Sequence, residues 1–187
     1  HVRVSTVLAP GHSPATYQPT PREMAALSRA RILFTVGVPF EERLVAKLGD
    51  MGVDIQVVDT SRGIELRYLE EHGTAREAHD GHDHHGRPDP HIWLDPRRAK
   101  VQARNIAAAL KEADPAHGAA YERNLAAFEE RLDRLDAEIA AILEAVKGKT
   151  FYVYHPSFGY FADAYGLRQK AVETGGKEPS ARQLAQL

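Results

Sequence analysis

Short apolar runs alternate with helical patterns over the first sixty residues. Strands are expected at 2–8, 31–36 and 53–58, and the nearly continuous apolar run at 31–36 is typical of a strand buried on both faces, as in a parallel sheet. Helices are expected between them, from Pro21 onward and over 41–48. This order of strands and helices predicts right-handed crossovers and an α/β layer architecture.

No regular pattern follows Asp59 until His91 is reached. A gap of about thirty residues is long for a loop in a compact domain, so we expect this stretch to be functional or partly disordered. A helix is then predicted over 97–112, with Asp95 as its cap and Pro96 at its first helical position.

The longest predicted helix runs from Asp114-Pro115 to Lys147, and Gly148 ends it. Its apolar residues recur at alternating spacings of four and three, which indicates a single apolar stripe. The stripe consists of Tyr121, Leu125, Phe128, Leu132, Leu135, Ile139, Ile142 and Val146. Such a helix would be roughly 45–50 Å long. We interpret it as a spine between two lobes, although a coiled-coil dimer would show the same stripe.

A second α/β pattern follows the long helix. A strand is expected at 150–154, and a short helix capped by Ser157 leads to a further strand at 168–173. A last helix begins at Ser180 and is still running at Leu187. One crossover and an unfinished helix do not complete a domain, so we expect this lobe to continue beyond the given sequence.

The pattern divides the chain into three parts. They are an N-terminal α/β lobe at 1–113 with a His-rich loop at 72–88, a linking helix at 114–148, and the start of a C-terminal α/β lobe at 149–187. The predicted fold class is α/β, with two lobes of parallel sheets and flanking helices joined by one long helix.

Composition limits the chemistry. With 187 residues, 43% of them hydrophobic, the chain can bury a core. The formal net charge of −2 comes without a basic stripe, which argues against nucleic acid as a partner. There is no cysteine, so any metal must be held by nitrogen and oxygen ligands. No apolar run reaches the roughly 20 residues that a membrane span needs.

The histidines are of two kinds. His91 stands at a loop–helix junction and His155 directly follows a strand, so both are candidate ligands for zinc, copper, nickel or iron, with a structural histidine held by backbone groups as the alternative. Four others stand among aspartate and glycine, with no apolar neighbour to anchor a core. They indicate a solvated loop that gathers metal, or one without a specific role: His79, His82, His84 and His85.

Four motifs, taken in their order along the chain, resemble the zinc/manganese class of solute-binding proteins of bacterial ABC importers. They are Pro10–Thr20, Asp89–Pro96, Tyr154–Phe161 and Glu178-Pro179-Ser180. Each motif alone is modest, whereas the ordered set covers the whole chain.

The resemblance implies two α/β lobes joined by a single long rigid helix, with one metal ion in the cleft between the lobes. It implies a monomeric binding protein that is not an enzyme and that passes its ion to an ABC transporter permease. Such a protein sits in the periplasm or is anchored to the cell surface, and its class is also associated with cell adhesion. It also leads us to expect further segments before His1 and after Leu187.

The resemblance also carries a ligand set onto this chain. Two family ligands fall on His91 and His155. The position of the first family ligand is occupied by Ala15, which cannot bind metal, and we expect His12, three residues earlier in the same turn, to replace it. The fourth ligand would lie beyond Leu187. Nitrogen-rich ligation without cysteine favours zinc over manganese, which prefers more oxygen ligands.

The expected function is therefore capture of zinc, or a similar divalent transition metal, outside the cytoplasm. Two alternatives remain open at this point. Three histidines around zinc with a free position are also typical of a zinc-dependent hydrolase, although the chain has no His-Glu-x-x-His motif and no carboxylate placed as a general base. A metal buffer or chaperone acting through the His-rich loop alone is the other.

Overall fold

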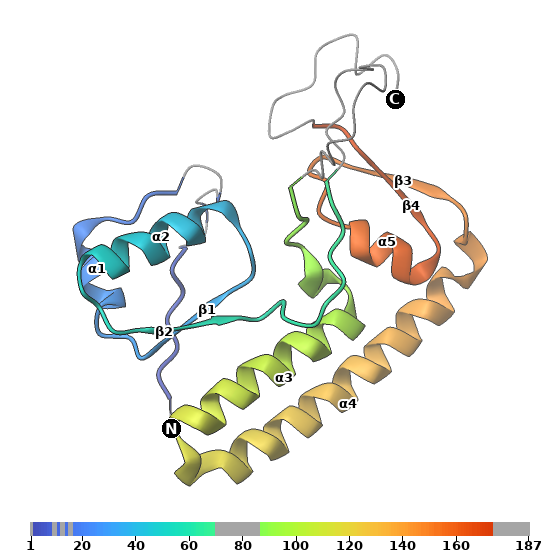
Figure 1. Cartoon of the computed structure of the whole chain (residues 1–187). Coiled ribbons are helices and arrows are strands. Elements are labelled where there is room, and N and C mark those ends of the chain that lie inside the picture. The colour runs from blue at the N-terminus through green and yellow to red at the C-terminus, as the bar shows by residue number, and fades with distance from the viewer. Residues whose placement is uncertain (1, 9–10, 12–13, 15–16, 70–86, 174–187) are drawn as a thin grey trace, which may run out of the picture. The chain divides into compact units, whose positions relative to one another are not determined.

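A computed structural model describes residues 2–8, 11, 14, 17–69 and 87–173 of the chain (Figure 1). It divides into two compact units, which we treat separately. The first contains His1–Ile64 and Lys100–Arg131, and the second contains Glu65–Ala99 and Leu132–Leu187. The predicted division at 113 and 148 follows the helices rather than these units, and it stays a prediction.

The first unit is built on a two-stranded parallel sheet. Strands β1 (Ile32–Thr35) and β2 (Gln56–Asp59) pair in register from Ile32↔Gln56 to Thr35↔Asp59, and α2 (Pro39–Asp50) is the crossover between them. Helix α1 (Pro21–Leu27) precedes β1. These elements confirm the strands expected at 31–36 and 53–58 and the two helices.

Local signals explain where these helices begin. Thr20 caps α1: its Oγ1 accepts from Glu23 N–H at 3.3 Å, and its own N–H donates to Glu23 Oε2 at 2.7 Å, which completes a capping box. At the start of α2, the Glu41 carboxylate accepts from the N–H groups of Val36, Gly37 and Val38. Gly37 has φ +90°, a conformation that suits glycine.

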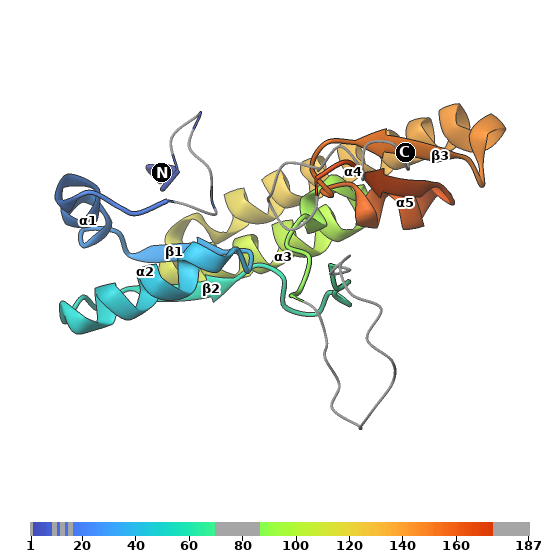
Figure 2. The same cartoon turned by 90° about the horizontal axis from the view of Figure 1, so that it is seen from above.

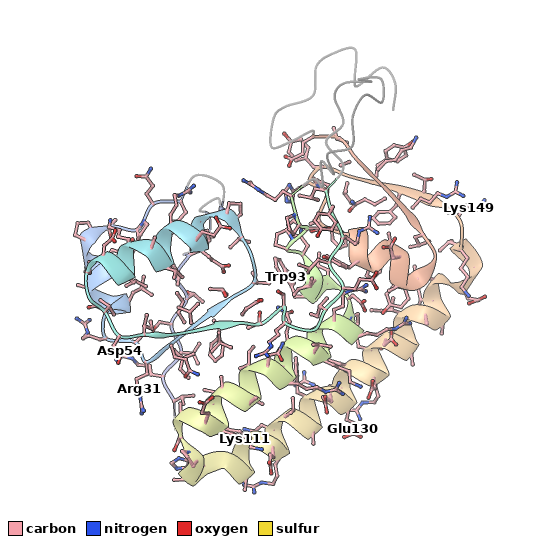
Figure 3. The ribbon with its side chains drawn as sticks, viewed as in Figure 1. Arg31, Asp54, Trp93, Lys111, Glu130 and Lys149 are labelled. Carbon is pink, nitrogen blue, oxygen red and sulfur yellow. The ribbon has the colours of Figure 1, made fainter. Side chains whose placement is uncertain are left out.

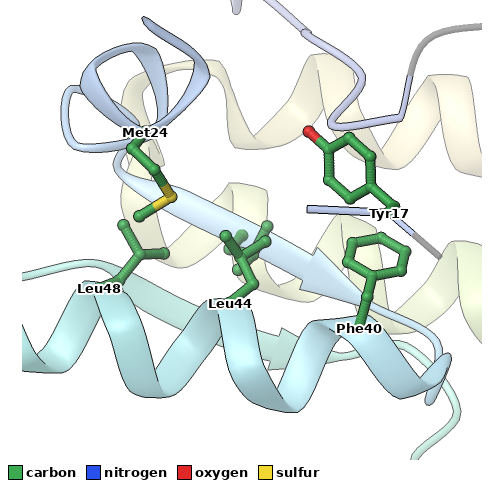
Figure 4. Packing of buried hydrophobic residues seen from close by; sticks show 6 residues of the cluster. Tyr17, Met24, Phe40, Leu44 and Leu48 are labelled. Atoms are coloured by element: carbon green, nitrogen blue, oxygen red, sulfur yellow. The ribbon is translucent and has the colours of Figure 1, made fainter. Parts of the chain in front are cut away.

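The core of the first unit lies between α1, β1 and α2. Figure 4 shows side chains of Met24, Leu44 and Phe40 gathered there, and Tyr17 meets Phe40 edge to face with ring centroids 5.2 Å apart. Leu44 and Leu48 are almost completely buried. The spacing of four places them on one face of α2.

The strand expected at 2–8 is wrong. Residues 2–8 are described without any strand pairing, and Val2 and Val4 stay exposed. An extended apolar segment becomes a strand only when a sheet edge accepts its backbone hydrogen bonds, and here Tyr17 Oη bonds to Val7 O instead.

The two long helices follow the sequence closely. Helix α3 (Pro96–Ala113) begins after Asp95, whose Oδ1 accepts from Arg97 N–H at 3.0 Å, so the predicted cap is confirmed. Helix α4 (Gly118–Leu143) is the longest, and 3₁₀ turns η2 (Pro115–His117) and η3 (Glu144–Val146) extend it at both ends. Both helices contribute residues to both units.

Ion pairs join α3 to α4 within each unit. Arg104 and Lys111 of α3 pair with Glu129 and Glu122 of α4 in the first unit. In the second unit Arg97 Nε lies 3.0 Å from Asp136 Oδ2, and Tyr165 donates to the same carboxylate. None of the helices in the described ranges is long and apolar enough to cross a membrane.

The second unit repeats the parallel-sheet plan. Strands β3 (Thr150–Val153) and β4 (Arg168–Ala171) pair in register from Thr150↔Arg168 to Val153↔Ala171, and α5 (Gly159–Tyr165) is the crossover that packs on β4 (Figure 2). Gly166, at φ +66°, ends α5. The expected cap Ser157 is wrong, because Phe158 occupies the N-cap and the Ser157 hydroxyl faces His155 O.

The long gap in the sequence pattern is anchored at its two ends. Tyr68 and Pro88 form an isolated antiparallel bridge, Leu69 N–H donates to Arg87 O at 2.9 Å, and Asp89 N–H donates to Arg67 O at 2.8 Å. The predicted metal-gathering loop with His79, His82, His84 and His85 lies outside the described residues.

Candidate metal centre

His91 is held by the residue two places before it. It stands at the N-cap of a short 3₁₀ turn, η1 (Ile92–Leu94). Asp89 Oδ1 accepts from His91 N–H at 3.0 Å and lies 2.6 Å from His91 Nδ1. A carboxylate offers only acceptor oxygens, so the ring nitrogen that faces it carries a proton. Nε2 is therefore the nitrogen of His91 that is left to bind a ligand.

Asp89 is itself fixed by buried contacts. It is only 2% exposed, and its backbone carbonyl accepts from Tyr160 Oη at 2.8 Å. The same Tyr160 oxygen accepts from Arg67 N–H at 2.9 Å. Burial raises the pKa of the Tyr160 phenol, so the phenol keeps the proton that it donates to Asp89.

His155 is supported in the same way from another direction. It follows β3, and Glu173 follows β4; because the strands are parallel, their carboxyl ends meet at one edge of the sheet. Glu173 N–H continues the ladder by donating to Tyr154 O at 3.0 Å. Glu173 Oε1 then lies 2.5 Å from His155 Nδ1, which again leaves Nε2 as the outward-facing nitrogen.

The two imidazoles converge on one point. Nε2 of His91 and Nε2 of His155 are 3.2 Å apart, and the ring centroids are 5.0 Å apart with an angle of 76° between the planes. Both residues belong to the second unit. Because Nδ1 of each ring carries the proton, the two Nε2 atoms face each other with their lone pairs and repel each other. A cation bound between them removes this repulsion.

The pair is accessible from solvent. The His91 side chain is 14% exposed and the His155 side chain 54%. Trp93, labelled in Figure 3, is the single tryptophan of the chain and is 45% exposed. Its ring centroid lies 5.4 Å from that of His91, so its fluorescence is a natural reporter of events at the pair.

The structure thus brings two of the three predicted ligands together. The third, His12, lies outside the described residues, as does Ala15. Among residues that the structure describes, no group of three His, Asp or Glu side chains is arranged to hold a metal ion. His91 and His155 are consequently a pair that needs further ligands to complete a coordination shell.

Sequence reasoning missed the two carboxylates. Asp89 had a usable signal, since an aspartate two residues before a histidine reaches its neighbour's backbone N–H in an Asx-type turn. Glu173 had none, because its position beside His155 depends on the register of β3 against β4.

Comparison with known proteins agrees with this architecture. With two small parallel sheets and a long helix shared by both units, the chain has the fold of two-lobe binding proteins. It belongs to the family of the zinc-uptake complex component A, periplasmic, whose family model matches residues 1–187. The resemblance inferred from the four motifs and the α/β fold class are confirmed.

Individual relatives extend the picture. The high-affinity zinc uptake system protein ZnuA of Brucella abortus (strain 2308) is 32% identical over an alignment of 206 positions, which covers 91% of this chain and 61% of that protein. A crystal structure of ZnuA superposes with a TM-score of 0.85 at 38% identity, covering 99% of this chain and 67% of that one. A ZnuA deletion mutant with zinc bound gives 0.84 at 38% identity, with 99% and 66% covered. This chain spans about 61% of the length of the Brucella relative.

Proposed function

We propose that this chain captures a zinc ion outside the cytoplasm and delivers it to the permease of an ABC importer. His91 and His155 supply two ligands through Nε2. The observation that carries this is the 3.2 Å separation of the two Nε2 atoms, each backed by a carboxylate on Nδ1. At Zn–N distances of about 2.0–2.1 Å, this separation corresponds to an N–Zn–N angle of about 100–106°, close to tetrahedral.

The choice of zinc rests on ligand chemistry and on the relatives. Imidazole nitrogen suits zinc, whereas manganese prefers carboxylate, carbonyl and water oxygens. The Brucella relative is named for zinc uptake, and one similar structure contains zinc. His12 is proposed as a third ligand because it stands three residues before Ala15, which occupies the position of a family ligand in the sequence motif.

Capture fits the site better than hydrolysis. A zinc hydrolase needs a group near the metal that can take a proton from bound water. Among the described residues, the two carboxylates that contact the imidazole pair, Asp89 and Glu173, are already engaged by Nδ1 of the two histidines. We therefore propose a binding protein and not an enzyme. We also propose an extracytoplasmic position, in the periplasm or anchored at the membrane surface; the periplasmic family and a relative named as a zinc-binding lipoprotein support this.

The test is a zinc titration in competition with a chromophoric chelator, followed in parallel by Trp93 fluorescence. His91→Ala and His155→Ala are each expected to weaken binding by orders of magnitude, because each removes one of two converging nitrogens. His117→Ala is the matched control: its Nδ1 also bonds an aspartate, Asp114, at 2.8 Å, but in the first unit. Unchanged affinity in both single variants, or manganese binding as tight as zinc, would refute the assignment.

A further inference from the structure

We infer that Asp89 and Glu173 are positioning residues, which hold a proton on Nδ1 of His91 and His155 and so turn both Nε2 lone pairs toward the ion. The identity of the ion rests on the proposed function, whereas the tautomer of each ring follows from contacts in the second unit alone. Neither carboxylate touches the ion in this arrangement; each acts through its histidine.

Asp89 is held in place by contacts within the second unit. Its N–H donates to Arg67 O, its C=O accepts from Tyr160 Oη, and its Oδ1 accepts from His91 N–H. The two backbone hydrogen bonds fix the main chain of Asp89, and its carboxylate cannot rotate away from the imidazole without losing the hydrogen bond from His91 N–H in a nearly buried position. The ring of His91 is consequently oriented through a residue that is already fixed.

The backbone of Gly159 approaches the other oxygen of Asp89 closely. Gly159, at the start of α5, lies so near that an added Cβ would be 3.1 Å from Asp89 Oδ2 and 2.8 Å from Arg67 Nε. Arg67 is in turn paired with Asp163 of the same helix. A side chain at this position would therefore require the Arg67 guanidinium to shift and would press on the Asp89 carboxylate.

Glu173 supports the second ring with less burial around the histidine. Its carboxylate is 11% exposed, while the His155 side chain is 54% exposed. Its position is set by the continuing β3–β4 ladder, in which Val172 N–H donates to Val153 O at 2.9 Å and Glu173 N–H to Tyr154 O. The two histidines are thus held from two different elements, a buried aspartate in the loop before η1 and the end of the β3–β4 sheet.

The arrangement also has an electrostatic consequence. A carboxylate hydrogen-bonded to the far nitrogen of an imidazole raises the basicity of the ligating nitrogen and fixes its tautomer. Two such pairs place two negative charges behind two neutral ligands, which balances a divalent cation. Outer carboxylates of this kind typically affect metal affinity by about 10–100-fold.

The experiment compares Asp89→Asn, Glu173→Gln and the control Asp95→Asn, all in the full chain. Asp95 is also a fully buried aspartate, but it caps α3 and contacts Arg97 and Arg98 instead of an imidazole. Imidazole nitrogens of the metal-free protein are observed by ¹⁵N NMR at one fixed pH, and zinc affinity is measured by chelator competition. Thermal unfolding of the metal-free protein checks that each variant folds.

In the unsubstituted protein we expect Nδ1 of both rings to be protonated. Asp89→Asn should lower Nδ1 protonation of His91 only, and Glu173→Gln that of His155 only, because a neutral amide is a weaker acceptor and can turn its NH₂ group inward. Each should lower zinc affinity by about 10–100-fold, whereas Asp95→Asn should leave both rings and the affinity unchanged. Should Asp89→Asn fail to fold, Glu173→Gln at the sheet edge carries the test.

Other outcomes separate this inference from the proposed function. Nδ1 protonation that is absent in the unsubstituted protein, or that survives both substitutions, overturns the positioning role whatever the zinc affinity. The expected tautomers in a protein that does not bind zinc support the positioning role and overturn the zinc assignment.

Discussion

Tyr160 is a buried residue whose hydroxyl holds the backbone of Asp89, the partner of His91. The substitution Tyr160→Phe tests how far the site depends on this contact. The substitution removes one oxygen and keeps the ring, including its contact with the Arg98 guanidinium, 4.7 Å from the ring centroid. It leaves two backbone groups without their partner, Arg67 N–H and Asp89 C=O.

The magnitude follows from burial. Tyr160 is 0% exposed and Asp89 2% exposed, so water cannot replace the lost hydroxyl at the Asp89 carbonyl. A buried polar group left unsatisfied costs about 1–3 kcal/mol. With one group fully buried and one partly so, we expect a loss of about 2–4 kcal/mol in the free energy of unfolding. For a chain of this size, that corresponds to a fall in Tm of roughly 5–15 °C.

A matched control lies five residues further along α5. Tyr165 is also buried, and its hydroxyl donates to Asp136 Oδ1 at 2.9 Å. That carboxylate keeps its Arg97 partner and is partly open to water, so Tyr165→Phe should cost about 1.5 kcal/mol, the lower end for a hydrogen bond to a charged group. It does not touch Asp89, so zinc affinity should be unchanged.

Thermal unfolding without metal, combined with zinc titration, distinguishes the two variants. Tyr160→Phe should lower both stability and zinc affinity, because the released Asp89 no longer holds the His91 ring in place. Tyr165→Phe should lower stability alone. Equal zinc affinity for Tyr160→Phe and the unsubstituted protein would refute the view that the Tyr160 hydroxyl orients the site.

Two further predictions concern other parts of the chain. Gly159→Ala should displace the Asp89 carboxylate and lower zinc affinity by about 10-fold, the smaller end of the range for residues that contact a metal ligand. Gly118→Ala is the control: at this helix start an added Cβ would have no neighbour within 4 Å, so it should raise the free energy of unfolding by about 0.4–1 kcal/mol and leave zinc binding unchanged. His12→Ala should lower zinc affinity about as much as His91→Ala, and Ala15→His should add little. A silent His12→Ala with tighter binding by Ala15→His would show that His12 does not ligate.

Local signals along the chain determined most of its secondary structure. The capping box at Thr20, the cap at Asp95 and the helical period from Pro115 to Val146 act between residues that are at most a few positions apart, so they operate before any tertiary contact forms. The failed strand at 2–8 shows the limit of such signals: an apolar extended segment says nothing about whether a sheet edge will accept it.

The helical stripe of α4 shows the same limit in packing. Its period located the helix, yet Tyr121 and Leu132 are buried whereas Phe128, Leu135 and Ile142 remain exposed. Periodicity determines which side chains share a face, and the neighbouring elements decide how much of that face is covered.

For the imidazole pair, too, the sequence determined one part of the site and the tertiary structure the other. Sequence motifs singled out His91 and His155, and the Asp89–His91 contact is local, because the two residues are only two positions apart. That the two rings meet with their Nε2 atoms 3.2 Å apart, across 64 residues of sequence, was decided by the tertiary structure. So were the Glu173 carboxylate behind His155 and the Tyr160 hydroxyl beneath Asp89. The physical reason is that these contacts depend on the register of β3 against β4 and on the packing of α5, which no short-range pattern in the sequence encodes.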